Sequence, residues 1–225
     1  MRGLATGNSA FSTFVQTLPR LPSVLKRMRP TWHLDRLDQV DAGFLAANGF
    51  RGIIWDVDGT LTGDRQDRVR PEAAPAFQAL QAMPALKHVV LSNAGEERYA
   101  QLGAMFPGLV ILRAYGKGDE VLFRRRHGSE DSWSPAELNR QLADGARVIR
   151  KPNRVLTDYA VRTLELPREA VLMIGDQYLT DIAGANLGGV RSVKLPTLAP
   201  DSFRTSVRFS HVLEKGLYSI LYRGA

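Results

Sequence analysis

The sequence predicts an α/β fold in which helices cover both faces of a doubly wound parallel sheet. Short apolar runs of strand length alternate along the chain with longer segments of helical pattern. The chain has 225 residues, of which 44% are hydrophobic and 24% charged, as expected for a globular domain with a sizeable core. In such a sheet, ligands bind beyond the carboxyl ends of the strands. We therefore expect the catalytic or ligand-binding residues of the chain at that edge of the sheet.

Residues 1–49 form a basic N-terminal segment that we expect to pack on the core. No acidic residue precedes Asp35, whereas five arginines and lysines do. One face of a short predicted helix carries Leu21, Val24, Leu25 and Met28. The alternative is that this basic, amphipathic segment lies on an anionic membrane surface. Its Arg-bearing, acid-free character also overlaps with that of an organellar transit peptide. A second helix is predicted over residues 38–48.

Residues 50–225 contain the predicted α/β domain. Strands are expected at residues 52–56, 88–91, 109–112, 148–149, 171–174 and 190–195, and helices at 71–83, 96–106, 153–164 and 180–187. The charged stretch 114–147 interrupts this alternation, and we predict a small lid or insert there. Only a short loop and one helix separate the first of these strands from the second. This spacing leaves no room between them for a large cap domain.

Two carboxylates end the first strand of the domain. Asp56 and Asp58 follow the apolar run 52–55, and residues i and i+2 of an extended segment share a face. Two like charges this close repel each other unless a positive group lies between them or one carries a proton. The arrangement suits a divalent metal and a carboxylate nucleophile with a neighbouring proton donor. The alternative is a solvated turn, because Asp-Gly is common in turns.

Polar residues follow the later strands in the same way. Ser92 and Asn93 end the strand at 88–91, Lys151 precedes a helix, and Asp176 ends the strand at 171–174, with Asp181 beyond it. Each has an ordinary structural explanation, such as a helix cap, a solvated charge or a turn. Their placement at successive junctions of one predicted edge instead indicates an active site.

These motifs resemble those of the haloacid dehalogenase (HAD) superfamily of phosphatases and phosphotransferases, whose core is Rossmann-like. The resemblance covers roughly residues 50–195 and consists of Asp-x-Asp-Gly-Thr at 56–60, Ser92, Lys151 and Gly-Asp-x-x-x-x-Asp at 175–181. More narrowly, the sequence resembles the class IIIA phosphatases of the YqeG and phosphatidylglycerophosphatase type. The closer features are Lys151-Pro152, Gln177 and the basic segment before the first strand.

The resemblance implies a Mg²⁺-dependent phosphomonoester hydrolase with an aspartyl-phosphate intermediate. Asp56 would be the nucleophile, and Asp58 would protonate the leaving group and then activate water. Mg²⁺ would be held by Asp56, the backbone carbonyl of Asp58 and Asp176.

The resemblance also implies which residues bind the phosphoryl group. Ser92, with Thr60 and Asn93 nearby, would bind the phosphoryl oxygens. Lys151 would neutralise charge on the nucleophile and the phosphoryl group, and Asp181 would orient Lys151.

The charge of the chain bears on its substrate and location. The net charge of +7 and the isoelectric point near 10.0 favour an anionic partner. We predict a large or membrane-lipid substrate such as phosphatidylglycerophosphate, and a cytoplasmic enzyme. Contact of its basic N-terminus with the inner face of the membrane is the alternative to packing on the core. Arg124–Arg126 lie near the site entrance or form a solvated charge run. A soluble sugar-phosphate or nucleotide phosphatase is the alternative.

Other classes of protein are less compatible with the composition. A basic RNA- or ribosome-associated binding protein with a vestigial site is a further alternative, although the chain lacks the aromatic-rich motifs of RNA-binding modules. No apolar run reaches the roughly 18–20 residues of a transmembrane helix. The absence of cysteine excludes disulfides, thiolate zinc sites and a Cys nucleophile.

Overall fold

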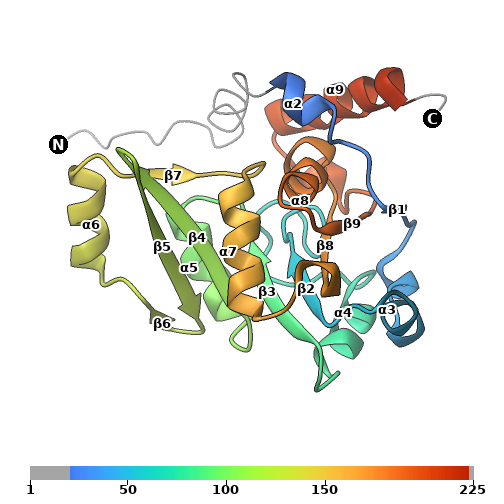
Figure 1. Ribbon diagram of the computed structural model, residues 1–225, viewed down its shortest axis with the longest axis horizontal. Coiled ribbons are helices and arrows are strands. Elements are labelled where there is room, and N and C mark those ends of the chain that lie inside the picture. The colour runs from blue at the N-terminus through green and yellow to red at the C-terminus, as the bar shows by residue number, and fades with distance from the viewer. Residues whose placement is uncertain (1–20, 223–225) are drawn as a thin grey trace.

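The computed structural model describes residues 21–222, which form one mixed sheet with helices on both faces (Figure 1). Six strands run parallel, in the spatial order β1 (Trp32–His33), β9 (Arg191–Lys194), β8 (Val171–Gly175), β2 (Gly52–Trp55), β3 (Lys87–Leu91) and β4 (Val110–Lys117). Three antiparallel strands extend β4, namely β5 (Glu120–His127), β6 (Glu130–Asp131) and β7 (Arg147–Ile149). The predicted doubly wound α/β fold class is confirmed.

The helices connect these strands in the alternating order that the sequence predicts. They are α2 (Leu21–Leu25), α3 (Ala42–Asn48), α4 (Ala74–Gln81), α5 (Glu96–Met105), α6 (Pro135–Ala143), α7 (Arg154–Leu164), α8 (Ala183–Leu187) and α9 (Thr205–Tyr222). Single turns of 3-10 helix occur at η2 (Leu37–Gln39), η3 (Arg168–Ala170) and η5 (Pro200–Ser202), and a π-helical turn at η4 (Tyr178–Ile182).

Alternating residues of the strands belong to two hydrophobic cores, one on each face of the sheet. In β2, Ile53 and Trp55 belong to the core shared with α3, α4 and α5, whereas Ile54 belongs to the core shared with α7 and α8. All three side chains are fully buried. A strand that is apolar on both faces is typical of a parallel sheet covered by helices on each side.

Strand β4 is longer than the predicted strand 109–112, and this extra length positions Lys151. Its first half pairs with β3 up to Leu112, and its second half pairs on the same side with β7, where Ala114 lies opposite Ile149. Because β7 runs antiparallel to β4, its carboxyl end approaches the carboxyl end of β3. Lys151, which follows β7, therefore lies at the edge of the sheet where β2 and β3 end.

Residues 114–147, where the sequence predicts a lid or insert, begin inside β4 and continue the sheet. A hairpin joins β4 to β5, β6 adds a short outer strand, and α6 lies beyond it at the far end of the molecule (Figure 1). Ser134 caps α6 by accepting a hydrogen bond from the Glu137 N–H.

The arginine triplet 124–126 is not a uniformly solvated charge run, because successive side chains of β5 point to opposite faces. Arg124 is 5% exposed and donates to Glu96 (2.7 Å) and to Asp131 (2.6 Å), while its guanidinium stacks on the ring of Tyr99. Arg125, in contrast, is exposed. The buried member of the triplet therefore connects β5 to the start of α5.

The N-terminal elements depart from the predicted ones in two ways. The helix predicted over residues 38–48 is interrupted, because the Asp41 carboxylate accepts from the Phe44 N–H (2.7 Å) and starts α3 afresh. Helix α2 is short, but Val24 and Met28 from its apolar stripe are buried. The transit-peptide and targeting interpretation concerns residues 1–30, of which residues 1–20 lie outside the described residues.

Candidate active site

The loop after β2 brings Asp56 to the edge of the sheet beside Asp176. The Asp56 N–H donates to the Ile174 carbonyl of β8 (3.0 Å), which aligns the ends of the two strands. The Thr60 hydroxyl donates to Asp56 Oδ2 (3.1 Å) and lies 3.4 Å from Asp176 Oδ1. Gly59 has a φ of +97°, and a Cβ there would lie 2.6 Å from Asp176 Oδ2. Only glycine allows this turn to pack so closely on the Asp176 carboxylate.

Lys151 is the centre of a buried ion-pair triad. Its ammonium donates to Asp56 Oδ1 (2.6 Å) and to Asp181 Oδ1 (2.7 Å), and the Lys151 side chain is 5% exposed. Burial alone would lower the pKa of Lys151, but Asp181 and Asp56 hold it above its ordinary value. The second oxygen of Asp181 accepts from the Gln177 N–H (3.0 Å). Asp181 therefore contacts the Lys151 ammonium with one oxygen and the Gln177 backbone with the other.

The carboxylates of this site outnumber its ammonium group. Asp56, Asp176 and Asp181 each have a carboxylate oxygen within 4.8 Å of the others, and all three residues are buried. Burial and the charge of Asp181 raise the pKa of Asp176 to about 6, and the same two causes raise the pKa of Asp56 well above its ordinary range. Lys151 and the nearby buried Lys194 are fewer than these three carboxylates, so the site has an excess of negative charge when all three are ionised.

The donor set fits a hard divalent cation. Asp176 Oδ2 is buried and has no hydrogen-bond partner among residues 21–222. A buried carboxylate oxygen without a partner is costly unless a ligand or ion completes its coordination. Carboxylate oxygens with room for water are what Mg²⁺ takes in proteins. The acidic cluster is therefore compatible with Mg²⁺.

Asp58 and Asp56 bind different cations. Asp58 Oδ1 accepts from Arg98 Nη2 (2.7 Å) and from the Arg65 N–H (3.2 Å), and Thr62 lies within hydrogen-bonding distance (3.3 Å). Arg98, on α5, is 4% exposed. The repulsion anticipated between the two carboxylates is thus relieved by a separate partner for each one, Lys151 for Asp56 and Arg98 for Asp58.

The loop after β3 is joined to Lys151 through Asn93. The Lys151 N–H donates to Asn93 Oδ1 (2.7 Å), and Asn93 Nδ2 donates to the Lys151 carbonyl (3.0 Å). The Asn93 side chain is therefore used to position Lys151. Ser92, the other polar residue predicted here, accepts from the Ala94 N–H (3.2 Å) and is partly exposed.

Two arginines donate to the backbone carbonyls of this same loop. Arg150 donates to the carbonyl of Asn93, and Arg113 to the carbonyl of Ala94. Arg150 has no ion-pair partner in the described part of the chain, and burial and the charge of Arg113 lower its pKa. An uncompensated cation beside Ser92 gives this side of the site a positive field.

The structure therefore brings together the site residues that the sequence singles out. Asp56, Thr60, Lys151, Asp176 and Asp181 are linked by direct contacts, Asn93 holds the Lys151 backbone, and Ser92 and Asp58 lie next to members of this group. Sequence reasoning missed Arg98, Arg113 and Arg150, because an arginine within a predicted helix or just after a predicted strand gives no sign of the loop it contacts.

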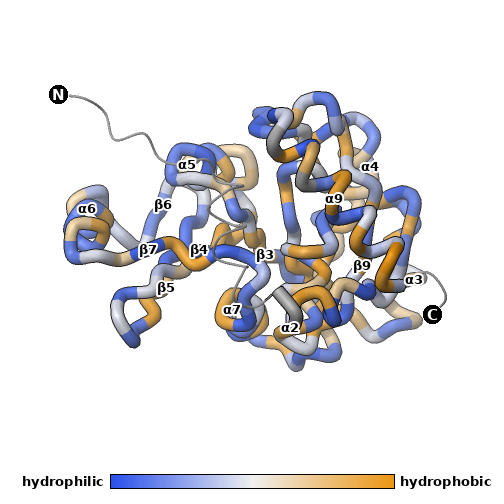
Figure 2. The backbone as a smooth tube through the Cα atoms, turned by 90° about the horizontal axis from the view of Figure 1, so that it is seen from above, coloured by the Kyte–Doolittle hydropathy of each residue, from blue (hydrophilic) through white to orange (hydrophobic). Residues whose placement is uncertain are grey.

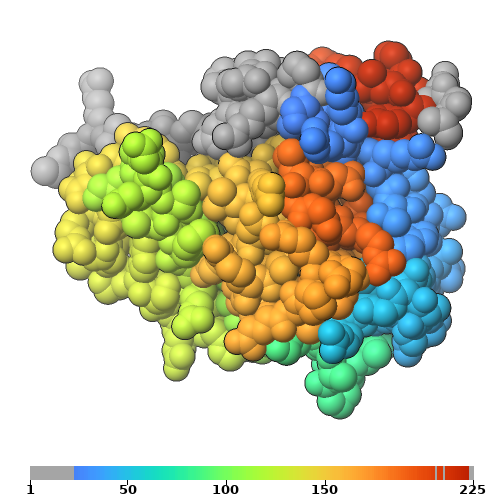
Figure 3. Space-filling view, viewed as in Figure 1, coloured from blue at the N-terminus to red at the C-terminus, as the bar shows by residue number. Residues whose placement is uncertain are grey.

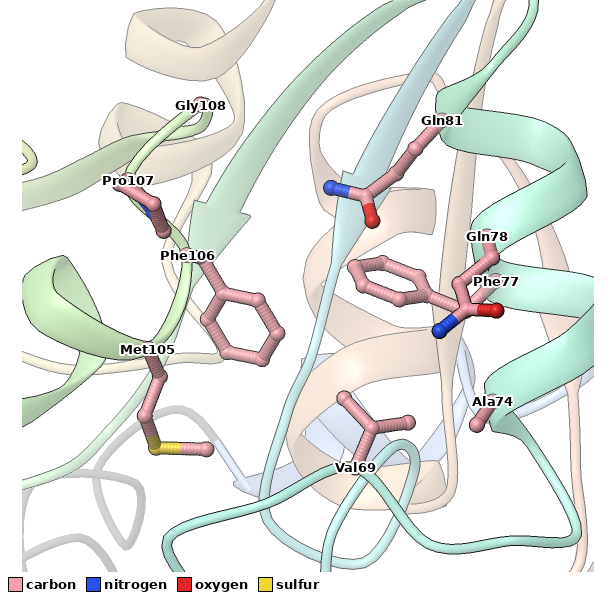
Figure 4. Close-up of a pocket in the computed structure, with 9 residues that line it drawn as sticks. All are labelled: Val69, Ala74, Phe77, Gln78, Gln81, Met105, Phe106, Pro107 and Gly108. Carbon is pink, nitrogen blue, oxygen red and sulfur yellow. The ribbon is translucent and has the colours of Figure 1, made fainter.

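A cavity of about 350 Å³ lies apart from these residues, between α4 and the end of α5 (Figure 4). It is lined mainly by apolar side chains, including Phe77 and Phe106, whose ring centroids are 5.6 Å apart. None of the predicted site residues lines it. It offers no charged group for a phosphorylated ligand.

Comparison with known proteins identifies the family to which this site belongs. Residues 148–197, which include Lys151, Asp176 and Asp181, match a family model described as HAD-hydrolase-like. The chain is 39% identical over 180 residues to the "Probable phosphatase YqeG" of Bacillus subtilis, and the match covers 80% of this chain and 83% of that protein.

Solved structures with low sequence identity also resemble the model. An uncharacterised protein from Listeria monocytogenes is 18% identical with a TM-score of 0.42, and the match covers 74% of this chain and 99% of that one. A haloacid dehalogenase-like hydrolase from Brucella suis is 15% identical with a TM-score of 0.38, covering 72% and 88% of the two chains. These values are too low to add to what the YqeG relative shows.

Proposed function

We propose that this chain, which belongs to the HAD family of phosphatases, hydrolyses a membrane-lipid phosphomonoester such as phosphatidylglycerophosphate with the help of Mg²⁺. The observation that carries the proposal is the buried Asp56–Lys151–Asp181 triad beside the unpartnered oxygen of Asp176. It combines a carboxylate nucleophile, a fixed cation and a place for a metal at one edge of the sheet.

The proposed reaction proceeds in two steps. A carboxylate oxygen of Asp56 attacks phosphorus, the bond from phosphorus to the alkoxide breaks, and Asp58 donates a proton to that alkoxide. Asp58 then accepts a proton from a water molecule, which attacks the aspartyl phosphate and releases inorganic phosphate. Asp56 returns to its starting carboxylate form.

The remaining polar residues stabilise the charge that develops during transfer. Lys151 lies on Asp56 and is the group placed to neutralise the nucleophile and the transferring phosphoryl oxygens. Ser92 and Thr60 offer hydroxyl groups to the phosphoryl oxygens. Asn93 and Asp181 act through Lys151, one holding its backbone and the other its ammonium.

Mg²⁺ would be held by Asp56, Asp176 and the backbone carbonyl of Asp58. When bound, it would neutralise the excess of carboxylate charge and polarise the phosphoryl group.

Two features support a lipid substrate, namely the absence of a cap domain between β2 and β3 and the positive net charge of the chain. Between β2 and β3 there is a loop and the single helix α4, with no cap domain. An open site suits a head group that stays attached to a bilayer. Basic residues near an anionic lipid surface each contribute about 1 kcal/mol of attraction, and the chain has a net charge of +7. Among residues 21–222, no helix is both long and apolar enough to cross a bilayer.

A substrate panel tests the proposal. The full chain would be assayed for phosphate release from phosphatidylglycerophosphate, from sugar phosphates and from nucleoside monophosphates, each with Mg²⁺ and with a chelator. We expect Mg²⁺-dependent turnover, with the highest kcat/KM for the lipid. Turnover confined to the soluble esters would instead identify a sugar-phosphate or nucleotide phosphatase. Absence of turnover on every ester would favour an RNA- or ribosome-binding protein with a vestigial site.

A further inference from the structure

The solvent side of helix α9 is apolar. Of seven large hydrophobic side chains that are exposed in the described part of the chain, five lie on α9. Phe209 (69% exposed), Val212 (69%), Leu213 (44%) and Ile220 (78%) are spaced i, i+3, i+4 and i+11, which places them on one side of the helix. We call these four residues the outer face of α9. Hydrophobic positions recur along α9 in Figure 2, which views the molecule from the side where α9 lies.

The opposite side of α9 already has its packing partner. His211, Glu214 and Tyr218 face the domain, where Tyr218 stacks on Tyr178 with ring centroids 4.0 Å apart. The helix is therefore anchored without help from its outer face. Single exposed hydrophobic residues are ordinary on a protein surface, but a row of them on one helix marks an interaction site.

Helix α9 lies at the same end of the sheet as the catalytic carboxylates. It packs against η4, the turn that carries Asp181, and the Leu179 N–H of that turn donates to the Glu214 carboxylate. Anything that docks on the outer face of α9 is consequently held at the active-site edge of the molecule.

The charges around this face are positive. Lys215 is exposed on α9, whereas Glu214, the one acidic residue of the helix, is buried. The basic segment after α2 lies beside α9 in Figures 1 and 3, and it exposes Lys26, Arg27 and Arg29. The Tyr222 hydroxyl joins the two elements by donating to the Leu25 carbonyl (2.8 Å).

An apolar strip beside exposed cations matches the interface of an anionic bilayer, where apolar side chains enter the acyl boundary and basic ones contact head groups. A second copy of the chain is a poorer partner, because two such faces would bring their basic flanks together. We propose that the outer face of α9, with the basic segment 26–29, docks this phosphatase on an anionic lipid membrane. The proposal extends the proposed function and rests on it for the lipid nature of the substrate.

Vesicle binding tests this proposal directly. The full chain would be sedimented with phosphatidylcholine vesicles that do or do not contain phosphatidylglycerol, and we expect binding to the phosphatidylglycerol vesicles that weakens with added salt. The double variant Phe209→Ser/Ile220→Ser should bind at least about tenfold more weakly, since burial of one large apolar side chain alone changes affinity by about that factor. Lys26→Gln/Lys215→Gln should lose affinity only for the vesicles that contain phosphatidylglycerol.

The matched control is Val121→Ser/Leu142→Ser, which removes two exposed apolar side chains far from α9. It should bind vesicles as the unmodified chain does. Failure of the unmodified chain to bind, or equal binding by Phe209→Ser/Ile220→Ser, would overturn the proposal. A dimer in solution that Phe209→Ser/Ile220→Ser converts to monomer would do the same, because the face would then belong to a second copy.

Turnover of soluble p-nitrophenyl phosphate separates this proposal from the proposed function. We expect Phe209→Ser/Ile220→Ser to leave that turnover unchanged while slowing hydrolysis of phosphatidylglycerophosphate in vesicles. Loss of soluble turnover in the double variant would contradict a role limited to docking. If the unmodified chain binds vesicles but hydrolyses no ester, the proposed function fails while the docking surface stands.

Discussion

At the scale of single residues, the site depends on how its buried charges are paired. Asp56 and Asp58 are two positions apart in the sequence, yet the first binds Lys151 and the second binds Arg98. Separate partners stabilise two carboxylates that would otherwise repel each other. They also fit the different roles proposed for the two residues, with Asp56 as the nucleophile and Asp58 as the proton donor and acceptor.

The acidic residues and the lysine of this site could be predicted from the sequence, but the arginines around them could not. Asp56 and Asp176 follow apolar strands whose ends the parallel sheet brings together, whereas Lys151 reaches the same edge from the antiparallel strand β7. Arg98 is the third residue of an ordinary helix, and its contact with Asp58 depends on the rotation of α5. Such tertiary detail leaves no pattern in one sequence.

Arg150 gives a first prediction at this scale. It contacts the carbonyl of Asn93 and has no ion-pair partner among residues 21–222, so it is available to an anionic substrate. Replacing it with Gln should raise KM for p-nitrophenyl phosphate about tenfold, which is the value of one charge-assisted hydrogen bond, with a smaller change in kcat. Steady-state kinetics measure this, with exposed Arg147→Gln as the control. An unchanged KM would exclude Arg150 from substrate binding, and Arg150→Lys should restore most of the affinity.

At the scale of elements, the strands of the sheet were easier to predict than the insert. Apolar runs of strand length mark β2, β3 and β8, whereas β5 is mostly polar and contains three consecutive arginines. Its pairing with β4 buries Arg124 through contacts with residues from other elements. Helix α9 could not be predicted as a packed helix, because its apolar stripe lies on the solvent side, whereas its packed side carries the polar residues His211 and Glu214.

The arginine triplet supplies a matched pair of variants. Arg124→Met would remove the partner that Glu96 and Asp131 share, while Glu96 keeps Arg113 and Asp131 keeps Arg126. We expect the free energy of unfolding to fall by about 2 kcal/mol, the value of a hydrogen bond to a charged group, because neither carboxylate is left without a cation. Arg125→Met, at the neighbouring exposed position, should change it by less than about 0.5 kcal/mol. Equal effects in urea denaturation would contradict the buried network.

The contact between α9 and η4 should make the stability of the chain depend on pH. Burial and the charges of Asp176 and Asp181 raise the pKa of Glu214 to about 8 from its ordinary value of 4.5. The folded chain therefore keeps a proton that the unfolded chain releases, and stability falls as pH rises from about 4.5 to about 8. Glu214→Gln keeps the acceptor for the Leu179 N–H and removes this loss. As pH rises from about 4.5 to about 8, the melting temperature of Glu214→Gln should increasingly exceed that of the unmodified chain. A constant difference between the two melting temperatures would refute the raised pKa of Glu214.

At the scale of the whole molecule, the fold gathers negative charge inside the site and positive charge outside it. The buried carboxylates lie at the carboxyl edge of the sheet, and the exposed basic residues of α9 and segment 26–29 lie at the same end. The α/β fold class and this edge could be predicted from the alternation of strands and helices. The sequence does not predict that α9 and the basic segment 26–29 lie side by side, because they come from opposite ends of the chain.

The excess of carboxylates makes the stability of the whole chain depend on Mg²⁺ and pH together. If Mg²⁺ binds the folded site as proposed, it should raise the melting temperature. Because the pKa of Asp176 is raised to about 6, protons compete with the metal below that pH. The shift caused by Mg²⁺ should consequently be larger at pH 7 than at pH 5, and absent in Asp176→Asn. A shift of equal size at both pH values, or in the variant, would show that Mg²⁺ binds elsewhere.

The proposed reaction depends on Asp56 as the nucleophile of a Mg²⁺-dependent phosphatase. Its most direct test compares phosphate release by the unmodified chain and by Asp56→Asn, with p-nitrophenyl phosphate and phosphatidylglycerophosphate as substrates. We predict that the variant keeps its circular dichroism spectrum and cooperative unfolding, since Lys151 retains Asp181, while turnover falls by several orders of magnitude. Retention of Mg²⁺-dependent turnover by a folded Asp56→Asn variant would contradict the account.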